Sequence, residues 1–253
     1  MIVKKVRKSE AMAKFDALYV SGRSWLVGID EAGRGALAGP VCAAAAAVSA
    51  ECYKRKDCIE ALGELDDSKR LSPEARERVY GVLAALKKAG LVDYEAAFAS
   101  VEEIEKLNIL AATRVAMERA CSAINGRLGL NLRSAGQPCT LFGESASDMS
   151  TASVVIDGKP LKGFAYAHAA VVKGDASSLA IAAASVVAKV ERDRLMGRIA
   201  EKYPRFMFGV NKGYGTAAHM QALMLFGPSA VHRGSFLKNI RDDAPRQSQA
   251  ELF

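Results

Sequence analysis

The alternation of apolar and polar positions predicts a strand pair near the start of the chain. Trp25–Ile29 is an apolar run typical of a buried strand that stops at Asp30 and Glu31. After a turn at Gly33-Arg34-Gly35, the alanine-rich run Pro40–Val48 predicts a second strand. Two strands joined by a glycine turn indicate a hairpin-like beginning.

Three later apolar runs predict the remaining strands. Leu91–Ala99 is the first, Val154–Ile156 ends at Asp157, and Tyr166–Val172 ends before Lys173-Gly174-Asp175. Residues 127–152 are rich in Gly, Ser, Ala and Asn without a clear period, which indicates a loop or a partly disordered insert.

Apolar residues at helical spacing predict helices between and after these strands. Ser72, Pro73 and Glu74 form a helix start, because serine caps the first turn and proline suits its first position, and Gly90 ends this helix. The other predicted helices are Glu102–Ile124, ended by Gly126, then Ser177–Tyr203 and 216–226, with a helical lead-in around Ala11–Leu18. The pattern as a whole is mixed α/β.

The chain is long enough for one large domain with a full core, since half of its 253 residues are apolar. We expect an N-terminal extension over residues 1–22, a domain over 23–240 that includes a helical C-terminal part, and a flexible polar tail over 241–253. The sequence shows no internal repeat.

Charge and cysteine content narrow the functional class. A net charge of +7 favours a polyanionic partner, although many basic proteins bind no nucleic acid. The five cysteines are odd in number and lack a Cys-x-x-Cys pair, which argues against a zinc knuckle or a disulfide framework and indicates a cytoplasmic protein. The longest apolar run, Val41–Val48, is too short to span a bilayer and no export signal is evident, so we expect no membrane association. We also expect a monomer.

Four carboxylates lie where predicted strands end: Asp30, Glu31, Asp157 and Asp175. Strand ends of one sheet can lie side by side, so these acids are candidates for one cluster, although an acid after a strand can also merely start a turn. Carboxylate oxygens suit Mg²⁺ or Mn²⁺. Two such ions about 4 Å apart can activate water and stabilise the leaving oxygen of a phosphodiester.

Three loops carry candidate substrate contacts. They are Gly33-Arg34-Gly35, Ser68 with Lys69, and Lys212 with Tyr214. A glycine turn lets backbone groups approach a sugar hydroxyl or a phosphate, lysine can meet phosphate, and tyrosine can stack on a sugar or base. The polar residues before the Ser72 helix can touch the substrate or support the acids. Each loop also has a plain interpretation as a solvated turn.

Other catalytic patterns are missing from the sequence. His168, His219 and His232 are far apart and without a metalloprotease pattern, so each is predicted to be structural or on the surface. No phosphate-binding Gly-x-x-x-x-Gly-Lys loop and no Gly-x-Ser-x-Gly nucleophile turn occurs.

Seven blocks, in order, resemble the motifs of the type 2 ribonucleases H, and of their bacterial HII class in particular. They are Gly28–Val41, Asp67–Leu71, Glu103–Thr113, Ile156–Gly158 with Lys173–Asp175, Ala183–Asp193, Lys212–Thr216 and His232–Phe236. The resemblance covers roughly residues 25 to 238. It implies a ribonuclease H-like fold, in which a mixed sheet is flanked by helices, for the domain over 23–240.

The resemblance also implies an activity. Asp30, Glu31, Asp157 and Asp175 would bind magnesium or manganese, and water would attack on the 5′ side of a ribonucleotide, leaving 3′-hydroxyl and 5′-phosphate ends. The substrates would be RNA–DNA hybrids and duplex DNA with embedded ribonucleotides, whose repair such enzymes start. The Gly33-Arg34-Gly35 turn would read the 2′-OH, Tyr214 would sense the neighbouring deoxyribose, and Ser68, Lys69 and Lys212 would contact the substrate.

The chain departs from the family's pattern in two places. The segment 127–152 is longer than usual before the Ile-Asp-Gly block, which leaves Asp148 as a rival to Asp157, and Gly234 stands where the family usually has a polar or basic residue. The last residues, Gln249–Phe253, resemble the peptide that docks on bacterial sliding clamps. Two alternatives stay open: a non-catalytic nucleic-acid-binding protein on this scaffold, and a related metal nuclease that acts on all-DNA substrates.

Overall fold

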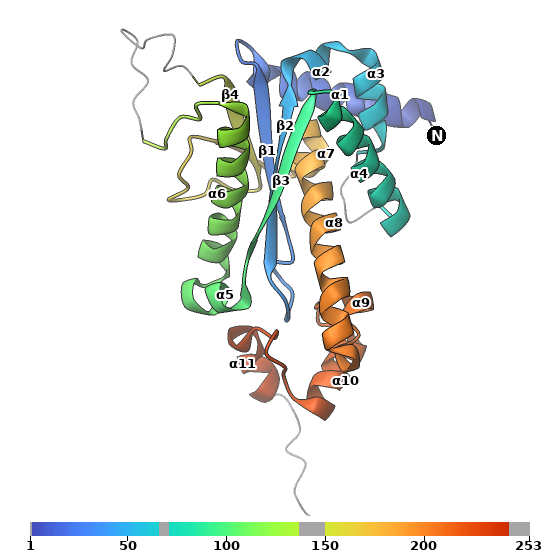
Figure 1. The fold of residues 1–253 in the computed structure, drawn as a ribbon, viewed down its shortest axis with the longest axis vertical. Helices are drawn as coiled ribbons and strands as arrows, with labels where there is room; N and C mark the ends of the chain where they lie inside the picture. The colour runs from blue at the N-terminus through green and yellow to red at the C-terminus, as the bar shows by residue number, and fades with distance from the viewer. Residues whose placement is uncertain (1, 66–70, 137–149, 243–253) are drawn as a thin grey trace, which may run out of the picture.

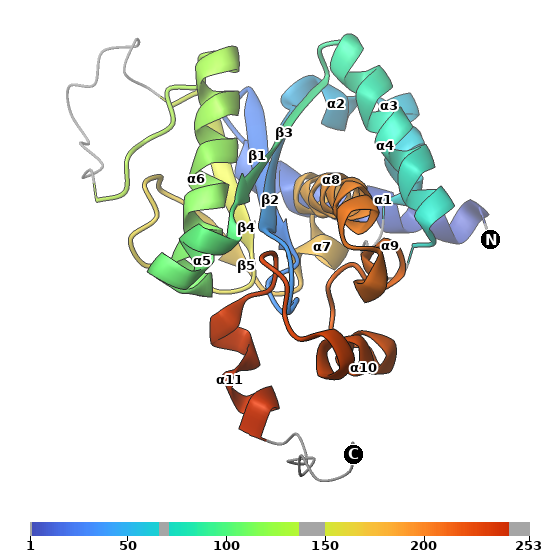
Figure 2. The same cartoon turned by 60° about the horizontal axis from the view of Figure 1, so that its bottom comes forward.

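A five-stranded mixed sheet, in the order β3-β2-β1-β4-β5, lies between two helical layers (Figures 1 and 2). The structure is a computed structural model that describes residues 2–65, 71–136 and 150–242. The strands are β1 (Trp25–Ala32), β2 (Val41–Ser49), β3 (Val92–Ala99), β4 (Ala152–Asp157) and β5 (Ala169–Val171). The β1-β2 and β2-β3 pairs are antiparallel, whereas β4 joins β1 and β5 joins β4 in parallel.

One long helix covers each face of the sheet. One face carries α5 (Val101–Leu107) and α6 (Ile109–Leu128), and the other carries α7 (Gly174–Ser177) and α8 (Leu179–Lys202). Four further helices lie around α8: α1 (Ile2–Val20), α2 (Ala50–Lys54), α3 (Lys56–Ala61) and α4 (Pro73–Lys88). At the end of the molecule that Figure 1 draws lowest lie α9 (Phe208–Asn211), α10 (Ala217–Phe226) and α11 (Gly234–Asp242). Short 3₁₀ turns occur at Leu62–Glu64 and Pro204–Phe206.

Strand β2 is apolar from Val41 to Val48, as suits a strand with both faces covered. Its alternate residues enter two different cores, with Ala44 on the α8 side and Ala43 on the α6 side. The neighbouring strand approaches α8 so closely that a Cβ added to Gly28 would lie 2.2 Å from the backbone carbonyl carbon of Ala180. Small residues therefore bring α8 against the sheet, and Ser185 of α8 against Asp30 near the end of β1.

The predicted hairpin is confirmed, but its first strand is longer than expected. The β1-β2 ladder continues through Asp30 and Glu31 to Ala32, so the prediction that the strand stops at the two acids was wrong. The prediction for Tyr166–Val172 was also too long, because only Ala169–Val171 pairs with β4 and Tyr166 forms an isolated bridge with Ser134.

The single helix predicted over Glu102–Ile124 is two helices that meet at Asn108. This residue has φ +68°, and its side chain accepts hydrogen bonds from the backbone N–H groups of Leu110 and Ala111. Asparagine suits both tasks, since it tolerates positive φ and caps helices well. The prediction that Gly126 ends the helix was wrong as well, because α6 continues to its left-handed cap at Gly129.

The N-terminal segment forms a helix that is longer than the predicted Ala11–Leu18 and packs on the main core. Met12 and Ala13 belong to the buried cluster on the α8 side. Asp16 is fully buried and accepts hydrogen bonds from the backbone N–H of Ala180 (3.1 Å) and the hydroxyl of Tyr53 (2.9 Å). Helix α1 is thereby attached to the first turn of α8.

Two predicted segments fall partly outside the described residues, namely residues 137–149 of the insert 127–152 and residues 243–253 of the tail 241–253. Within the described ranges, no helix is long and apolar enough to cross a bilayer. Cys42, Cys52, Cys58 and Cys121 are buried free thiols.

Candidate active site

Asp30 and Asp157 lie at the same level of two adjacent parallel strands. The register pairs Ile29 of β1 with Ile156 of β4, so the acid that follows each isoleucine is carried to the same edge of the sheet. Asp30 is only 7% exposed. Burial holds its pKa well above the ordinary value, and the negative charges of Glu31 and Asp157 raise that pKa further. The charges of Glu31 and Asp157 therefore both act on Asp30.

Each carboxylate has its own hydrogen-bond donor. Asp30 accepts from the backbone N–H of Glu31 (2.7 Å) and from the hydroxyl of Ser185 on α8. Glu31 accepts from Arg34 (2.9 Å), and Asp157 accepts from the backbone N–H of Gly174 (2.6 Å). These donors fix the orientation of three acids that repel one another.

Asp175 stands one residue beyond the backbone donor of Asp157. It lies in the first turn of α7, whose N-cap Lys173 has φ +57°. The left-handed residue lets the chain turn directly from β5 into this short helix, so that Gly174 faces Asp157. The charges of Glu31 and Asp157 thus both reach Asp30, and Asp175 follows directly after the Gly174 that bonds Asp157.

The acids suit a hard cation by their chemistry. Asp30, whose pKa is raised by burial and by the charges of Glu31 and Asp157, is a group whose repulsion Mg²⁺ or Mn²⁺ would relieve. Within the described ranges, however, no three Asp, Glu, His or Cys side chains stand close enough to enclose an ion. The reason lies in the strand, because successive residues such as Asp30 and Glu31 point to opposite faces and each is turned to its own donor.

The predicted glycine turn and Tyr214 lie in one cleft with Glu31. This cleft has a volume of about 570 Å³ and is lined by Glu31, Gly33, Arg34, Gly35, Ser185 and Tyr214, together with Arg76 and Lys189. Lys212 lines an adjacent cavity instead. Ser68 and Lys69 lie outside the described residues.

Two fully buried arginines hold the turn from beneath. Arg233 donates to the carbonyl oxygens of Gly33 (2.9 Å) and Arg34 (3.0 Å). Arg192 donates to the carbonyl oxygens of Ala38 (3.2 Å) and Lys212 (2.9 Å), so it joins the segment that follows the turn to the loop of Tyr214. Sequence reasoning missed both residues, although each stands inside a block that resembles the family.

The buried guanidinium groups interact with backbone carbonyls rather than with carboxylates. No ion pair joins either of them to an acid within the described part of the chain. Burial lowers the pKa of Arg192, and burial together with the charge of Arg192 lowers the pKa of Arg233 to about 9. Hydrogen bonds from these guanidinium groups to backbone carbonyls therefore fix the conformation of the turn and of the segment that follows it.

The two glycines of the turn have different environments. Gly33 has φ +88°, and a Cβ added to it would lie 1.8 Å from Nε of Arg192. A Cβ on Gly35 would have no neighbour within 4 Å. Gly33 is therefore required by the packing beneath the turn, whereas Gly35 leaves space on the side of the cleft.

The loop of Tyr214 is fixed by a second buried group. Tyr214 is 36% exposed, and its backbone carbonyl interacts with Nδ1 of His219 at 2.9 Å. His219 and His232 are buried, so of the two predicted possibilities, structural or on the surface, the structural one holds for both. They also contact each other, which their separation in the sequence did not reveal.

Comparison with known proteins gives one family. The family described as Ribonuclease HII matches residues 27–128 and 145–239. A ribonuclease HII from Caldanaerobacter subterraneus subsp. tengcongensis is 34% identical over 94% of this chain and 84% of its own length. That from Chloroflexus aurantiacus is 40% identical over 85% of this chain and 87% of its own.

Solved structures share the fold. In a PCNA:RNase HII complex from Archaeoglobus fulgidus, the similar chain gives a TM-score of 0.56 at 22% identity, covering 83% of this chain and 94% of that one. A Bst-RNase HIII in complex with Mn²⁺ gives a TM-score of 0.55 at 17% identity, covering 86% of this chain and 66% of that one. The predicted ribonuclease H-like mixed sheet is thus confirmed.

Proposed function

The chain belongs to the ribonuclease HII family and is a ribonuclease H, and from this premise we propose which bond it cuts. It hydrolyses the phosphodiester on the 5′ side of a ribonucleotide, in RNA–DNA hybrids and in duplex DNA with embedded ribonucleotides. The products carry 3′-hydroxyl and 5′-phosphate ends, and the nick starts repair of the ribonucleotide. The observation that carries the proposal is the shared cleft of Glu31, the glycine turn and Tyr214.

In this proposal the acids hold divalent metal. Asp30, Glu31, Asp157 and Asp175 would be the ligands for Mn²⁺ or Mg²⁺. When bound, a pair of such ions supplies an activated water and neutralises the leaving oxygen of the phosphodiester. The mutual repulsion at Asp30 supports this assignment, and so does the Mn²⁺ complex of a ribonuclease HIII that shares the fold.

The turn and the tyrosine select the sugar. The backbone of Gly33, Arg34 and Gly35 reads the 2′-OH, which is both a donor and an acceptor and so distinguishes ribose from deoxyribose. Tyr214 stacks on the neighbouring deoxyribose. Lys212, Ser68 and Lys69 contact the phosphate backbone. The hydrogen bonds that fix the turn support this role, because a rigid backbone can discriminate a single hydroxyl.

A duplex with one ribonucleotide tests the proposal. The protein should nick it once with Mg²⁺ or Mn²⁺, and Asp30→Asn should abolish the nick while binding largely persists. Asp57→Asn is the matched control, because Asp57 is exposed and bonded to Arg55 far from the cleft. Equal cutting of an all-DNA duplex would favour the alternative nuclease, and binding without any nick would favour the non-catalytic alternative.

The C-terminal peptide is proposed to recruit the enzyme to a sliding clamp. Gln249–Phe253 lies outside the described residues, and support comes from its sequence and from the fold relative solved with PCNA. Deleting residues 249–253 should weaken clamp binding and leave nicking of free oligonucleotides unchanged. Unaltered clamp binding would end this proposal.

A further inference from the structure

Helix α10 lies on the surface and yet contains no charged residue. Its sequence from Ala217 to Phe226 is Ala-Ala-His-Met-Gln-Ala-Leu-Met-Leu-Phe. A surface helix normally places charged or polar residues on the side that faces water. Here the last three residues, Met224, Leu225 and Phe226, are 62%, 69% and 51% exposed. Three consecutive apolar side chains that face solvent indicate a contact surface.

The last residue of this helix also lines a cavity. The cavity has a volume of about 260 Å³ and lies between the 3₁₀ turn Pro204–Phe206 and Phe226 with the three residues that follow it. The guanidinium of Arg205 lies 5.1 Å from the centre of the Phe226 ring. We call Met224, Leu225, Phe226 and this cavity the α10 patch.

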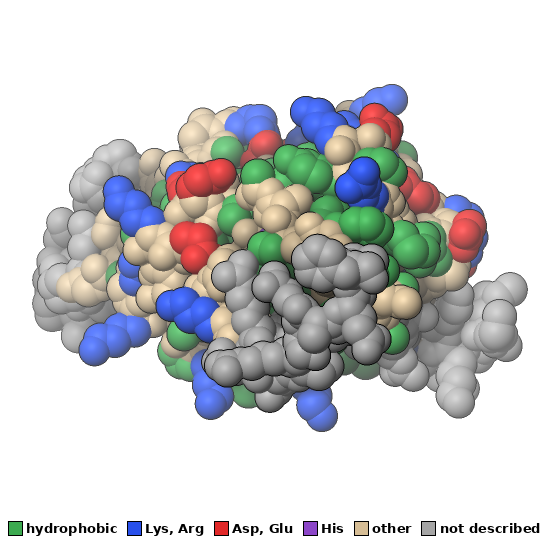
Figure 3. All heavy atoms as spheres, turned by 90° about the horizontal axis from the view of Figure 1, so that it is seen from below, with side chains coloured by type: hydrophobic (Ala, Val, Ile, Leu, Met, Phe, Trp, Pro, Cys, Tyr) green, Lys and Arg blue, Asp and Glu red, His purple; other side chains and the backbone are tan. Residues whose placement is uncertain are grey.

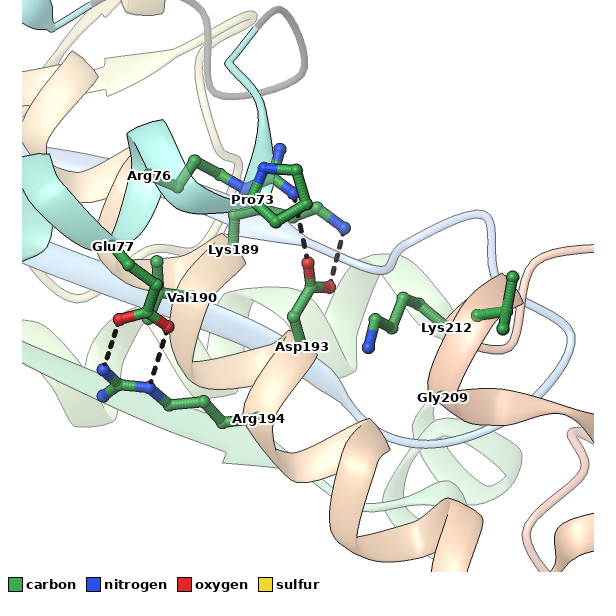
Figure 4. Close-up of a pocket in the computed structure, with 10 residues that line it drawn as sticks. Pro73, Arg76, Glu77, Lys189, Val190, Asp193, Arg194, Gly209 and Lys212 are labelled. Atoms are coloured by element: carbon green, nitrogen blue, oxygen red, sulfur yellow. Dashed lines mark hydrogen bonds and ion pairs between the residues drawn. The ribbon is translucent and has the colours of Figure 1, made fainter.

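The charges beside the α10 patch favour an acidic partner. Lys202 and Arg205 line its cavity, and within the described part of the chain neither of them forms an ion pair. In the cavity between α4 and α8, by contrast, Figure 4 shows Arg194 already paired with Glu77, at 2.7 Å. The α10 patch therefore combines an apolar surface with two cations that can accept a carboxylate.

The size of the patch suits a short peptide better than a second folded chain. Each of the three exposed side chains offers on the order of 100 Å² of surface. A stable interface between folded proteins buries about 800 Å² on each partner. A peptide that fits must carry apolar side chains next to an acid. The sequence Glu251-Leu252-Phe253, which lies outside the described residues, has this composition.

The position of that sequence in the chain allows it to reach the patch. It belongs to residues 243–253, which follow the last residue of α11, Asp242. Helices α11 and α10 lie at the same end of the molecule (Figures 1 and 2). An extended segment of this length spans up to about 35 Å, more than twice the roughly 15 Å length of α10.

We propose that Glu251–Phe253 docks on the α10 patch of its own chain, with its two apolar side chains against the helix and its carboxylate toward Arg205. A short tether holds the segment near the patch at an effective concentration on the order of 1 mM, so a weak contact suffices. An occupancy of about nine-tenths would weaken the binding of any competitor about tenfold.

This docking would regulate recruitment to a sliding clamp. The same residues belong to the peptide proposed to bind the clamp, so the segment cannot occupy the clamp and the α10 patch at once. That regulatory consequence rests on the proposed function, whereas the docking on α10 does not.

A fluorescent peptide of residues 243–253 tests the docking on full-length chains. Fluorescence anisotropy should show that it binds the double variant Leu252→Ser, Phe253→Ser about tenfold more tightly than the wild type, whose own segment fills the patch. Adding Leu225→Glu to the double variant should weaken peptide binding about tenfold or more, because a charge then enters the apolar surface. Equally weak binding to all of these chains would overturn the proposal.

Leu110→Glu is the matched control for Leu225→Glu. Leu110 lies on α6 and is 67% exposed, against 69% for Leu225, so both substitutions place a charge in solvent. In the background of the double variant, Leu110→Glu should leave peptide binding unchanged. An equal loss of binding in both glutamate variants would show that the added charge acts on the peptide from a distance, and it would overturn docking at α10.

Sedimentation of the full-length chains tests the other occupant, a second copy of the chain. A wild-type dimer that Leu225→Glu converts to a monomer would overturn the proposal and assign the α10 patch to self-association. A monomer at all concentrations, together with the expected peptide binding, would support docking within one chain.

Binding to a purified bacterial sliding clamp separates this inference from the proposed function. Leu225→Glu should bind the clamp about tenfold more tightly than the wild type, because its segment is released, and Leu110→Glu should bind it like the wild type. If the wild type binds the clamp and Leu225→Glu binds it no more tightly, the docking is refuted. Failure of every chain to bind the clamp would refute the proposed clamp docking, while the docking on α10 stands or falls with the peptide measurement.

Discussion

The Nε2 atoms of His219 and His232 lie 3.0 Å apart in the interior, so one of them must donate to the other. The backbone N–H of Ser229 donates to Nδ1 of His232 at 2.9 Å, which leaves the His232 proton on Nε2. His219 then accepts at Nε2 and donates from Nδ1 to the carbonyl of Tyr214 at 2.9 Å. This chain of hydrogen bonds requires both imidazole rings to be neutral. It ends at the carbonyl of Tyr214, whose loop lines the cleft.

Removing the middle ring should leave two buried polar groups without partners. We expect His219→Leu to lower the free energy of unfolding by about 2–4 kcal/mol, since the Tyr214 carbonyl and the His232 N–H both lose their bonds. Urea titration measures the loss. His168→Leu is the control, because that ring is only half-buried and its partners can turn to water, so the expected loss is less than about 1 kcal/mol. Equal losses in both variants would contradict the donor order.

The same pair should make stability depend on pH in a defined direction. Burial and the charge of His219 lower the pKa of His232 to about 4, and burial lowers the pKa of His219. An unfolded histidine titrates near 6.5, so between about pH 6.5 and 4 the unfolded chain binds more protons. The pair's contribution is complete above about pH 6.5 and is lost as the pH falls. A double His219→Leu, His232→Leu variant should lose this slope, which urea titrations between pH 4.5 and 7.5 would measure.

Asp16 should act in the opposite direction over the same range. Burial raises the pKa of its carboxyl to about 6, and its titratable hydrogen-bond partner Tyr53 ionises far above this range. The folded state therefore takes up the proton first, so Asp16 stabilises the fold at low pH and this contribution is lost as the pH rises through about 6. Relative to Asp16→Asn, the wild type should gain about 2–3 kcal/mol between pH 7 and pH 4. A constant difference between the two proteins would refute the assignment.

Local patterns predicted most elements because their causes are local. Ser72 caps α4 and Ser178 caps α8, close to where the sequence placed both helices. The error at the end of β1 arose because a tertiary contact decided the outcome, whereas the break at Asn108 has a local cause that the apolar spacing hides. Asp30 and Glu31 stay in β1 because β2 pairs with them, and this pairing is invisible in an apolar run that ends at two acids.

The candidate site was predictable in its acids and less so in its supports. Acids at strand ends have a recognisable pattern. An arginine in the sequence gives no sign of whether its side chain is buried, and most arginines are exposed. Arg192 and Arg233 become significant only when the turn folds over them. The exposure of apolar residues on α9 and α10 was not predicted from the sequence either. Figure 3, which views that end of the molecule, shows hydrophobic and charged side chains interleaved on the surface.

Arg233→Lys should separate the charge of that residue from its geometry. Lysine keeps the charge but cannot reach the carbonyls of Gly33, Arg34 and Gly39 together, as the guanidinium does. We expect a loss of about 2–4 kcal/mol in unfolding free energy and a larger fall in kcat/KM on the single-ribonucleotide duplex than unfolding alone explains. Arg198→Lys, on the exposed face of α8, should change stability by less than about 0.5 kcal/mol. Full activity of Arg233→Lys at low temperature would show that the charge alone suffices.

The two glycines of the turn offer the sharpest matched pair in the chain. Gly33→Ala should destabilise the protein by about 2 kcal/mol or more, because the new Cβ meets Arg192 and the backbone stays at φ +88°. Gly35→Ala meets no neighbour, so its unfolding free energy should stay within about 0.5 kcal/mol of wild type. If the turn reads a sugar hydroxyl at close range, Gly35→Ala should nevertheless bind the single-ribonucleotide duplex less tightly, since its methyl group enters the cleft from which the substrate is read. A stable Gly35→Ala variant that binds and nicks like the wild type would place the ribose contact elsewhere in the cleft. A Gly33→Ala variant as stable as the wild type would show that the Arg192 side chain can move away from the turn.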